Sequence, residues 1–442
     1  MGKATLGRTL AIVGLVALLV PGVATADVDV PSARRSVEVF SPDGSIARID
    51  ARLPEGQPLA AAEVSDAFGG LFPLQESGSP DNRYDLVFLG DGYTASQMDL
   101  YHEHVQDKWR TIAATEPFTT YANFFNVWVV DVVSNESGVD NDPRPPTQRD
   151  TALDMEFWCS GVERGLCVDE TKARQMAALA PAADQIVVLA NATKYGGIGG
   201  SVATSSGGNA AAGLITVHEL GHSLGGLADE YDYYLRAGLE EDAAKDVTIP
   251  APFTYYPGAV LGEPAGVNIT AESDAEAMVA QKLKWWRWVG EESPDGGPVG
   301  TFEGAGYYRL GMYRPTSDSL MHTLGTPEDP NPFNLPSREQ MIAKFYGTVR
   351  PLEAATPAGG TLRPGETATL ELVEPIGHTL DVRWFLDGEE VVDSRGLRAF
   401  DTTATTAGQT LTAQVTDRTS FVRDPEVISE LLTQQTSWIV SG

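Results

Sequence analysis

Residues 214–231 read LITVHELGHSLGGLADEY, and this stretch dictates how the middle of the chain must fold. His218 and His222 are four residues apart, so a helix places both imidazoles on one face, where they can bind one metal ion. Glu219 adjoins the first of them. Gly225 and Gly226 then end the helix and let the chain turn. The stretch therefore predicts a buried metal-binding helix that is followed by a tight turn.

This arrangement is typical of hydrolytic zinc sites, in which three protein ligands leave one position for water. Glu219 is predicted as the catalytic residue that takes a proton from the zinc-activated water and passes it to the leaving amine. A bare HExxH pattern arises by chance in a chain of this length with a probability on the order of a per cent. An ordinary histidine pair is the alternative, and the glycines and acids after the helix favour one catalytic zinc ion.

The third zinc ligand is predicted to be Asp229. Metzincins continue the motif as HExxHxxGxxH, or with Asp in the last position. Gly225 fits the glycine of that frame, but the ligand position falls on Ala228, which cannot bind metal. One extra residue in the turn, tolerated by Gly226, would bring Asp229 to the zinc. Glu230 is the alternative ligand, or a partner of a ligand histidine.

Two further segments are candidates for the same site. Met321, in DSLMH at residues 318–322, is predicted in a turn beneath the zinc, with an ordinary core methionine as the alternative. The segment GAGYYRLGMYRP at residues 304–315 is rich in Tyr and Arg. We predict that Tyr313, or else Arg314, stabilises the oxyanion, because preorganised donors must meet the developing charge.

Upstream, buried strands alternate with helices. The apolar runs 84–89, 125–133 and 185–190 are typical of buried strands. Helices are expected at 94–113, where Thr94 and Gln97 form a capping box, and at 170–180. This order predicts an α/β layer with a mostly parallel sheet. The glycine-rich segment 194–208 is expected to include an edge strand at 201–204 that pairs with a substrate peptide.

The first 26 residues are typical of a secretory signal peptide. Lys3 and Arg8 precede an apolar run at 10–20, and a small-residue cleavage site lies at 24–26. The run of about 11 residues is too short for a membrane span, which needs about 20. We expect a secreted protein, extracellular or periplasmic. Residues 27–80 then form a β lead-in with a hairpin of strands 36–40 and 46–52.

Residues 81–350 form the predicted catalytic domain, and the composition changes after it. Residues 351–442 contain short alternating strands, at 367–372, 380–386 and 410–415, and one helix near 426–433. An immunoglobulin-like β-sandwich fits this pattern. Cys159 and Cys167 are predicted to form a disulfide in an oxidising compartment. Asp140 and Asp142 belong either to a calcium site or to a solvated acidic loop.

Five separated blocks resemble the IgA-peptidase family of bacterial secreted zinc metallopeptidases. They are YDLVFLGDGYT at 84–94, SNESGVD at 134–140, TKYGGIGG at 193–200, HELGHSLGGLADEY at 218–231, and the 304–315 block with the following SLMH. The resemblance covers residues 80 to 348. It implies a metzincin-like domain in which His218, His222 and Glu219 have their usual roles, and a C-terminal β region. It does not transfer immunoglobulin A as the substrate.

The predicted function is a secreted zinc endopeptidase with a protein or peptide substrate. A net charge of −30 disfavours nucleic acid and anionic lipid as partners. Two alternatives stay open: a secreted zinc amidase that acts on a non-protein substrate, and a catalytically inactive binding or adhesion protein.

Overall fold

A computed structural model describes residues 34–40, 46–53, 56–200, 202–232, 255–358 and 360–441. The predicted signal peptide lies outside these residues. The largest sheet has eight strands in the order β2-β1-β7-β8-β6-β4-β5-β3. Their bounds are β1 Arg34–Phe40, β2 Ile46–Arg52, β3 Phe68–Gln75, β4 Tyr84–Asp91, β5 Phe125–Val132, β6 Gln185–Ala190, β7 Gly197–Ile198 and β8 Val202–Ser206. The predicted hairpin of the lead-in is confirmed as β1 and β2.

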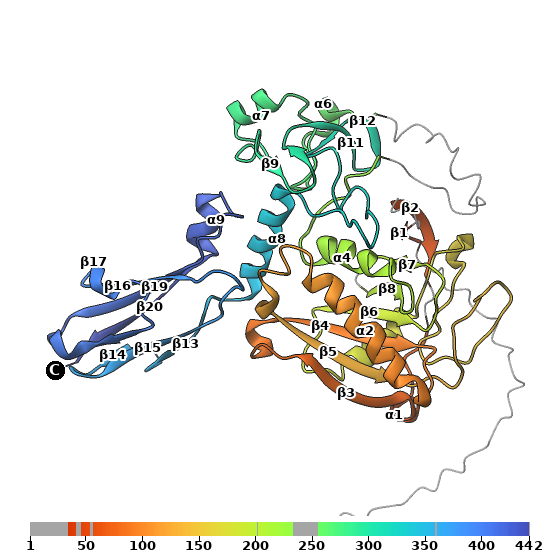
Figure 1. Cartoon of the computed structure of the whole chain (residues 1–442), viewed down its shortest axis with the longest axis horizontal. Helices are drawn as coiled ribbons and strands as arrows, with labels where there is room; N and C mark the ends of the chain where they lie inside the picture. The colour runs from red at the N-terminus through yellow and green to blue at the C-terminus, as the bar shows by residue number, and fades with distance from the viewer. Residues whose placement is uncertain are drawn as a thin grey trace, which may run out of the picture. The chain divides into compact units, whose positions relative to one another are not determined.

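The centre of this sheet is parallel and buried on both faces (Figure 1). Leu86 and Phe88 of β4 point into one core, and Val87 and Leu89 point into the other, as the alternation of a strand requires. Helices α2 Met98–Ala113, α4 Ala212–Ser223 and α8 Leu335–Thr348 contribute to the first core, and α3 Glu170–Ala177 contributes to the second. The predicted α/β layer is confirmed.

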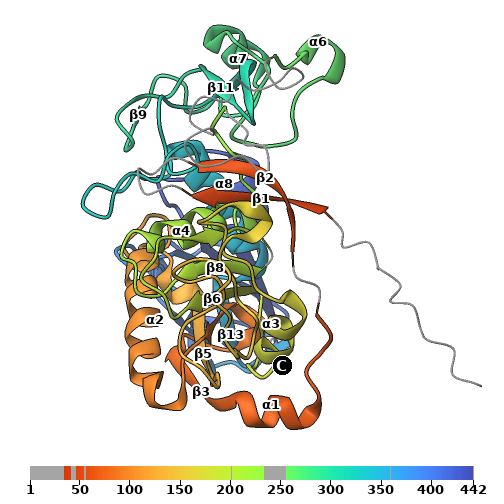
Figure 2. The ribbon, with the colours of Figure 1, turned by 90° about the vertical axis from the view of Figure 1, so that its right-hand side faces the viewer.

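The strand predicted at 201–204 exists as β8, but its predicted position at the sheet edge is wrong. β8 pairs with β6 on one side and with β7 on the other. β7 in turn pairs with β1 through Val39 and Ile198. The β1–β2 hairpin of the lead-in therefore extends the sheet past β8, and Figure 2 shows this hairpin beside α4 and β8.

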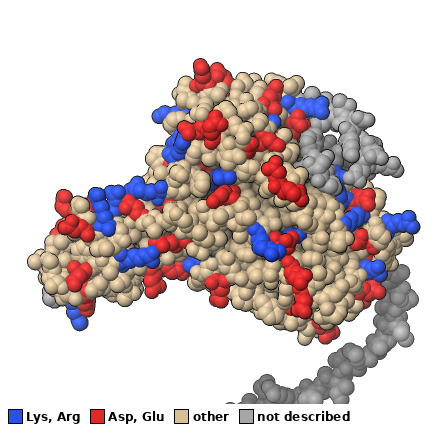
Figure 3. All heavy atoms as spheres, in the orientation of Figure 1, with Lys and Arg blue, Asp and Glu red and all other residues tan. Residues whose placement is uncertain are grey.

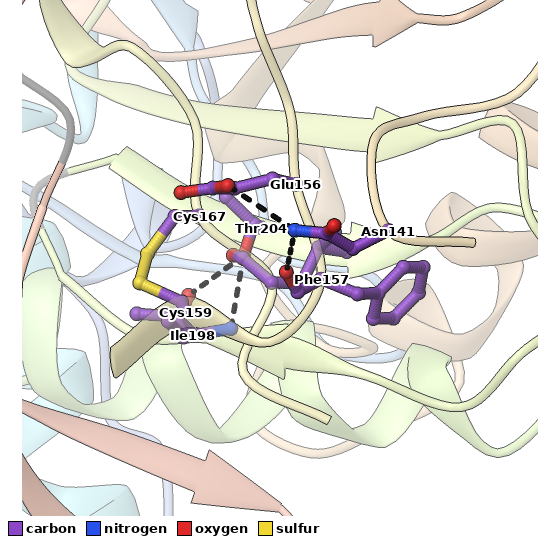
Figure 4. The surroundings of a disulfide bond; sticks show 8 residues. Asn141, Glu156, Phe157, Cys159, Cys167, Ile198 and Thr204 are labelled. Atoms are coloured by element: carbon purple, nitrogen blue, oxygen red, sulfur yellow. Dashed lines mark hydrogen bonds between the residues drawn. A yellow bond between two sulfur atoms is a disulfide. The ribbon is translucent and has the colours of Figure 1, made fainter. Parts of the chain in front are cut away.

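A disulfide joins Cys159 to Cys167, as predicted. The loop that it closes is tied to the sheet through Thr204 of β8 (Figure 4). The Thr204 hydroxyl donates to the Leu166 carbonyl at 2.6 Å, and the Ile198 amide donates to the Thr204 Oγ1 at 2.9 Å. Both half-cystines are buried, so the disulfide loop forms part of the packing at the β1 end of the sheet.

Shorter elements lie between β2 and β3 and between α4 and α8. They are helices α1 Ala61–Ala67, α6 Gly258–Leu261 and α7 Ala275–Gln281, the strand pair β9 Glu292–Ser293 and β10 Gly297–Pro298, and the hairpin of β11 Phe302–Ala305 and β12 Tyr308–Arg314. The β11–β12 turn approaches the segment that follows α4, because the Tyr307 amide donates to the Tyr231 carbonyl at 2.9 Å.

The C-terminal region has strands where the sequence predicts them, in two sheets that share one buried cluster around Trp384 and Trp438. One sheet contains β13 Leu352–Thr356, β15 Thr367–Leu372 and β18 Ala399–Asp401. The other contains β14 Gly360–Leu362, β16 Asp381–Leu386, β17 Glu389–Glu390, β19 Thr410–Thr416 and β20 Thr433–Val440. The predicted helix is α9 Pro425–Glu430. The immunoglobulin-like arrangement and the domain boundaries stay predictions.

Two features concern the surface. Figure 3 shows carboxylate side chains spread over one face, with basic side chains among them. No helix within the described ranges is long and apolar enough to cross a membrane.

Candidate metal centre

Helix α4 positions both histidines of the motif. Its residues 212–221 are all buried, and His218 and His222 lie one turn apart with their Nε2 atoms 3.0 Å from each other. The helix ends in a turn in which Gly226 has a φ of 65°, a conformation that glycine adopts without strain. The Gly226 amide donates to the His222 carbonyl at 2.9 Å. The chain thereby reverses direction and returns toward the two imidazoles.

Two carboxylates complete a cluster of four donors around one point. The Asp229 Oδ1 lies 3.1 Å from the His222 Nε2 and 3.4 Å from the His218 Nε2. The Glu38 Oε2, from β1, lies 3.2 Å from both nitrogens. All four ligand atoms lie within 4.8 Å of one another. The structure thus brings together the three predicted metal ligands and adds Glu38, which the sequence analysis did not select.

Backbone carbonyls set the orientation of both imidazole rings. The His218 Nδ1 lies 2.9 Å from the Leu320 carbonyl, and the His222 Nδ1 lies 2.7 Å from the Leu227 carbonyl. Each Nδ1 therefore carries a proton that it donates to the carbonyl, and the Nε2 of each ring is left as the atom that would bind a metal ion when the imidazole is neutral. Imidazole nitrogens and carboxylate oxygens are donors that zinc prefers. The residues present fit a metal ion.

Two tyrosines hold the carboxylates of the cluster. The Tyr307 hydroxyl donates to the Asp229 Oδ2, which turns the other oxygen of Asp229 toward the histidines. The Tyr231 hydroxyl donates to the Glu38 Oε1 at 2.8 Å. The two rings pack edge to face with centroids 5.3 Å apart. These hydroxyls are the aromatic donors that the structure brings to the cluster.

Glu230, the alternative ligand, lies in a separate buried network. Its carboxylate accepts hydrogen bonds from Asn268 at 2.9 Å, from Asn334 at 3.0 Å and from the Ser319 hydroxyl at 2.6 Å. Its amide donates to the Met321 carbonyl at 2.8 Å. Glu230 therefore fastens the turn that contains Met321 to the segment after α4, and it does not point at the metal ligands.

The Met321 turn packs directly against α4. A Cβ added to Gly221 would lie 2.8 Å from the Met321 sulfur, so only glycine at this helix position allows the turn to approach so closely. The turn also supplies the Leu320 carbonyl that orients His218. The segment predicted beneath the metal thus lies against the metal-binding helix.

Glu219 is buried beside the cluster, and its Oε1 has no hydrogen-bond partner. It lines a cavity of about 450 Å³ together with His222, Ser223, Gly200, Gln185, Asp184 and Arg174. Burial raises the pKa of Glu219, and the negative charge of Glu38 raises it further. A buried carboxylate that lines a cavity and has one oxygen without a hydrogen bond is suited to exchange protons with a bound molecule.

The cluster binds protons when no cation is bound. Burial lowers the pKa of His218, but the hydrogen bonds to Asp229 and Glu38 outweigh burial and raise it to about 9. Burial raises the pKa of Glu38, but the charge of His222 and further hydrogen bonds outweigh it and lower the pKa well below the usual value. A metal ion must therefore displace protons from the histidines, since metal binding needs neutral imidazole.

The structure places the other candidates elsewhere. Tyr313 lies in β12, where its hydroxyl donates to the Glu303 carboxylate at 3.3 Å, in a cavity whose lining includes none of the four cluster residues. The backbone of Tyr313 pairs with Thr270, and its side chain lies on the side of β12 that carries Glu303 as partner. The Arg314 guanidinium donates to backbone carbonyls such as that of Ser317 at 2.7 Å. Tyr313, which was predicted as the oxyanion donor, therefore lies apart from the four cluster residues in this structure.

The acidic loop also lies apart from the cluster. Asp140 accepts a hydrogen bond from the Arg149 amide at 2.5 Å. Among the described residues, the one group of three or more metal-binding side chains contains neither Asp140 nor Asp142. A calcium site at this loop therefore gains no support.

Comparison with protein-family models identifies the family to which this site belongs. The model of the family IgA Peptidase M64 matches residues 72–298 and 268–345. The chain belongs to this family. The peptidase is thus a hydrolase of a metallopeptidase family, as the sequence resemblance implied. A search of curated proteins found no match. The matched region contains His218, Glu219, His222 and Asp229, and it begins after Glu38.

We predict that Gly199→Ala lowers kcat/KM of the peptidase by about 10²-fold, because small displacements of a catalytic group are costly. A Cβ at this position would lie 1.9 Å from the carboxyl carbon of Glu219 and would push that carboxylate out of place. The metal content should not change. Gly347→Ala is the matched control, since its Cβ would meet nothing within 4 Å. A wild-type kcat/KM for Gly199→Ala would contradict this role of Gly199.

Proposed function

We propose that the peptidase is a secreted zinc endopeptidase whose zinc ligands are His218, His222 and Asp229 and whose general base is Glu219. The observation that carries the proposal is the convergence of two oriented imidazoles and one carboxylate on a single point, next to a buried carboxylate that opens into a cavity. Three protein ligands are the usual number for a catalytic zinc site.

A zinc ion at this cluster would lower the pKa of a water molecule and polarise the carbonyl of the scissile bond. Glu219 then accepts the proton of the attacking water and donates it to the leaving amine. Its Oε1, which accepts no hydrogen bond from the described residues, supports this role, because that oxygen is available to take the proton. Asp229 is held in place by Tyr307, and the two histidines are held by backbone carbonyls, so the ligands are preorganised.

The metzincin-like character of the domain is part of the proposal. The turn at Gly225 and Gly226 returns an acidic ligand to the helix with one residue more than the usual frame. The Met321 turn packs against the same helix at Gly221. Both features support a metzincin-like site in which Asp229 takes the third ligand position.

Secretion and substrate are proposed on separate grounds. The N-terminal segment has the pattern of a signal peptide, and the disulfide suits an oxidising compartment. The family's name refers to immunoglobulin A, but nothing in the cluster selects that protein. We propose a protein or peptide substrate. The C-terminal sheets either bind that substrate or stabilise the catalytic region.

The deciding experiment measures zinc content and hydrolysis of a denatured protein mixture for three proteins. The wild type, brought to its active form, should contain one zinc ion per chain and should be active. Glu219→Gln should keep zinc and lose about 10²- to 10⁴-fold in kcat, as expected for loss of a general base.

The third protein, Asp229→Asn, should bind zinc at least about tenfold more weakly. If the wild type binds zinc but neither it nor the two variants hydrolyse protein, the result would point to an amidase of non-protein substrates or to an inactive binding protein. Absence of zinc binding in the wild type would contradict the proposal.

A second comparison separates two tyrosines. We propose Tyr231, whose hydroxyl reaches the cluster through Glu38, as the oxyanion donor, so Tyr231→Phe should lower kcat by about 10²- to 10³-fold and keep the zinc. Tyr313→Phe removes a hydroxyl that lies against Glu303 and should lower kcat much less. The opposite order of the two kcat values would restore Tyr313 as the oxyanion donor.

A further inference from the structure

The metal cluster contains four protein donors, one more than a catalytic zinc site uses. A catalytic zinc site keeps a coordination position open, whereas a site closed by four protein ligands is structural. Glu38 is the fourth donor, with its Oε2 3.2 Å from the Nε2 atoms of both His218 and His222. Its other oxygen accepts the hydroxyl hydrogen of Tyr231. Given the proposed function, Glu38 occupies the position that water or a substrate carbonyl must take.

Glu38 belongs to a part of the chain that is separable from the catalytic fold. It lies in β1, before the region that matches the peptidase family. β1 and β2 form the last two strands at one end of the sheet, and one residue pair, Val39 with Ile198, joins them to β7. Removal of this hairpin leaves the strand order from β7 to β3 intact.

β1 also covers the surface beside the metal ligands. Val37 and Val39 are buried against Cys159, Cys167 and Ile198. On the other side of the strand, Phe40 is fully buried, and its ring meets the His218 ring edge to face at 5.5 Å between centroids. Glu38 and Phe40 are two residues apart, so they project from the same face of β1. An extended peptide bound to a sheet edge places its side chains in the same manner.

We propose that β1 is an intramolecular inhibitor that lies in the substrate groove, with Glu38 at the metal and Phe40 in a pocket for a substrate side chain. The pocket next to His218 then accepts a large apolar side chain two residues away from the position that Glu38 holds. The bound strand is antiparallel to β7, and a substrate takes the same direction after β1 has left.

The chain offers a place for release. Residues 56–58, between the hairpin and α1, are exposed. The next residue, Leu59, is anchored to the catalytic region, because its amide and carbonyl bond to the Gln175 side chain at 2.7 and 2.9 Å. Hydrolysis of one peptide bond in residues 56–58 adds one water and yields a new carboxylate and a new amine. The hairpin can then dissociate, while α1 and β3 stay attached at the far end of the sheet.

The test compares full-length wild type with Glu38→Ala, and intact mass is used to verify that neither chain is cut. The probe is acetohydroxamate, a small chelator that needs an open metal position. Glu38→Ala should bind it at least about tenfold more tightly than the wild type. In the wild type only the molecules whose site is open can bind the chelator, so the apparent affinity is the intrinsic affinity multiplied by the open fraction. Both proteins should keep one zinc ion, and the rate of peptide hydrolysis should rise by a similar factor. Glu103→Ala, an exposed carboxylate on α2, is the control.

The outcomes separate this inference from the proposed function. Equal affinities for acetohydroxamate in wild type and Glu38→Ala, with zinc retained, would overturn the inhibitor role whatever the activity. Loss of zinc from Glu38→Ala would make Glu38 a permanent ligand and would also overturn it. Tighter acetohydroxamate binding without peptide hydrolysis would support the inhibitor role and contradict the endopeptidase mechanism.

A second variant covers the case in which Glu38→Ala does not fold. The recognition sequence of a site-specific protease is inserted between Gln57 and Pro58, which leaves Gly56 against Asp169, and the folded protein is compared before and after cutting. The cut protein should release the hairpin and bind acetohydroxamate at least about tenfold more tightly. Release of the hairpin with unchanged affinity would overturn the proposal.

Discussion

The structure depends on two imidazoles, that of His218 buried and that of His222 partly buried, whose Nε2 atoms face each other at 3.0 Å. Such a pair is unfavourable in an apolar interior unless protons, carboxylates or a cation compensate the polar atoms. The chain supplies two carbonyls on the Nδ1 side and two carboxylates on the Nε2 side. These four groups come from three segments: the residues directly after α4, the Met321 turn and β1. The fold around the helix can therefore be understood as the means of holding these partners in place.

The carbonyls and carboxylates that contact the two imidazoles come from segments at different distances along the chain. Leu227 and Asp229 follow the helix directly and need only the glycine turn. Leu320 lies in the Met321 turn, and hydrogen bonds of Glu230 link this turn to the segment after α4. Glu38 arrives from the opposite direction, in a strand added to the end of the sheet. The local partners form the permanent part of the site, whereas the strand that carries Glu38 is joined to the sheet by one residue pair. The same cluster can therefore be closed by β1 and opened by its departure.

Much of this could be predicted from the sequence, for reasons that differ from residue to residue. The His218 helix and the strands of the parallel sheet follow from periodicity within one short segment, and Asp229 follows from counting residues around Gly226. Tyr313 was predicted at the metal and lies elsewhere, because the pairing of β12 with Thr270 is a long-range contact that local pattern does not reveal. For the same reason the sequence analysis did not select Tyr231 and Tyr307, whose hydroxyls donate to the two carboxylates of the cluster. Glu38 lies 180 residues from His218 in sequence, and an acid in a short alternating strand gives no signal of its partner. β8 was misplaced at the edge for a related reason, since the β1–β2 hairpin that extends the sheet past β7 and β8 comes from the N-terminal part of the chain.

The central claim is that one zinc ion is bound between His218, His222 and Asp229. X-ray diffraction data from zinc-loaded crystals, collected on both sides of the zinc absorption edge, test it directly. A single anomalous peak at about 2.0–2.2 Å from both Nε2 atoms and from the Asp229 carboxylate would agree with the account. A peak at another place, or a histidine pair that stays bridged by protons with no peak in zinc-loaded crystals, would contradict it.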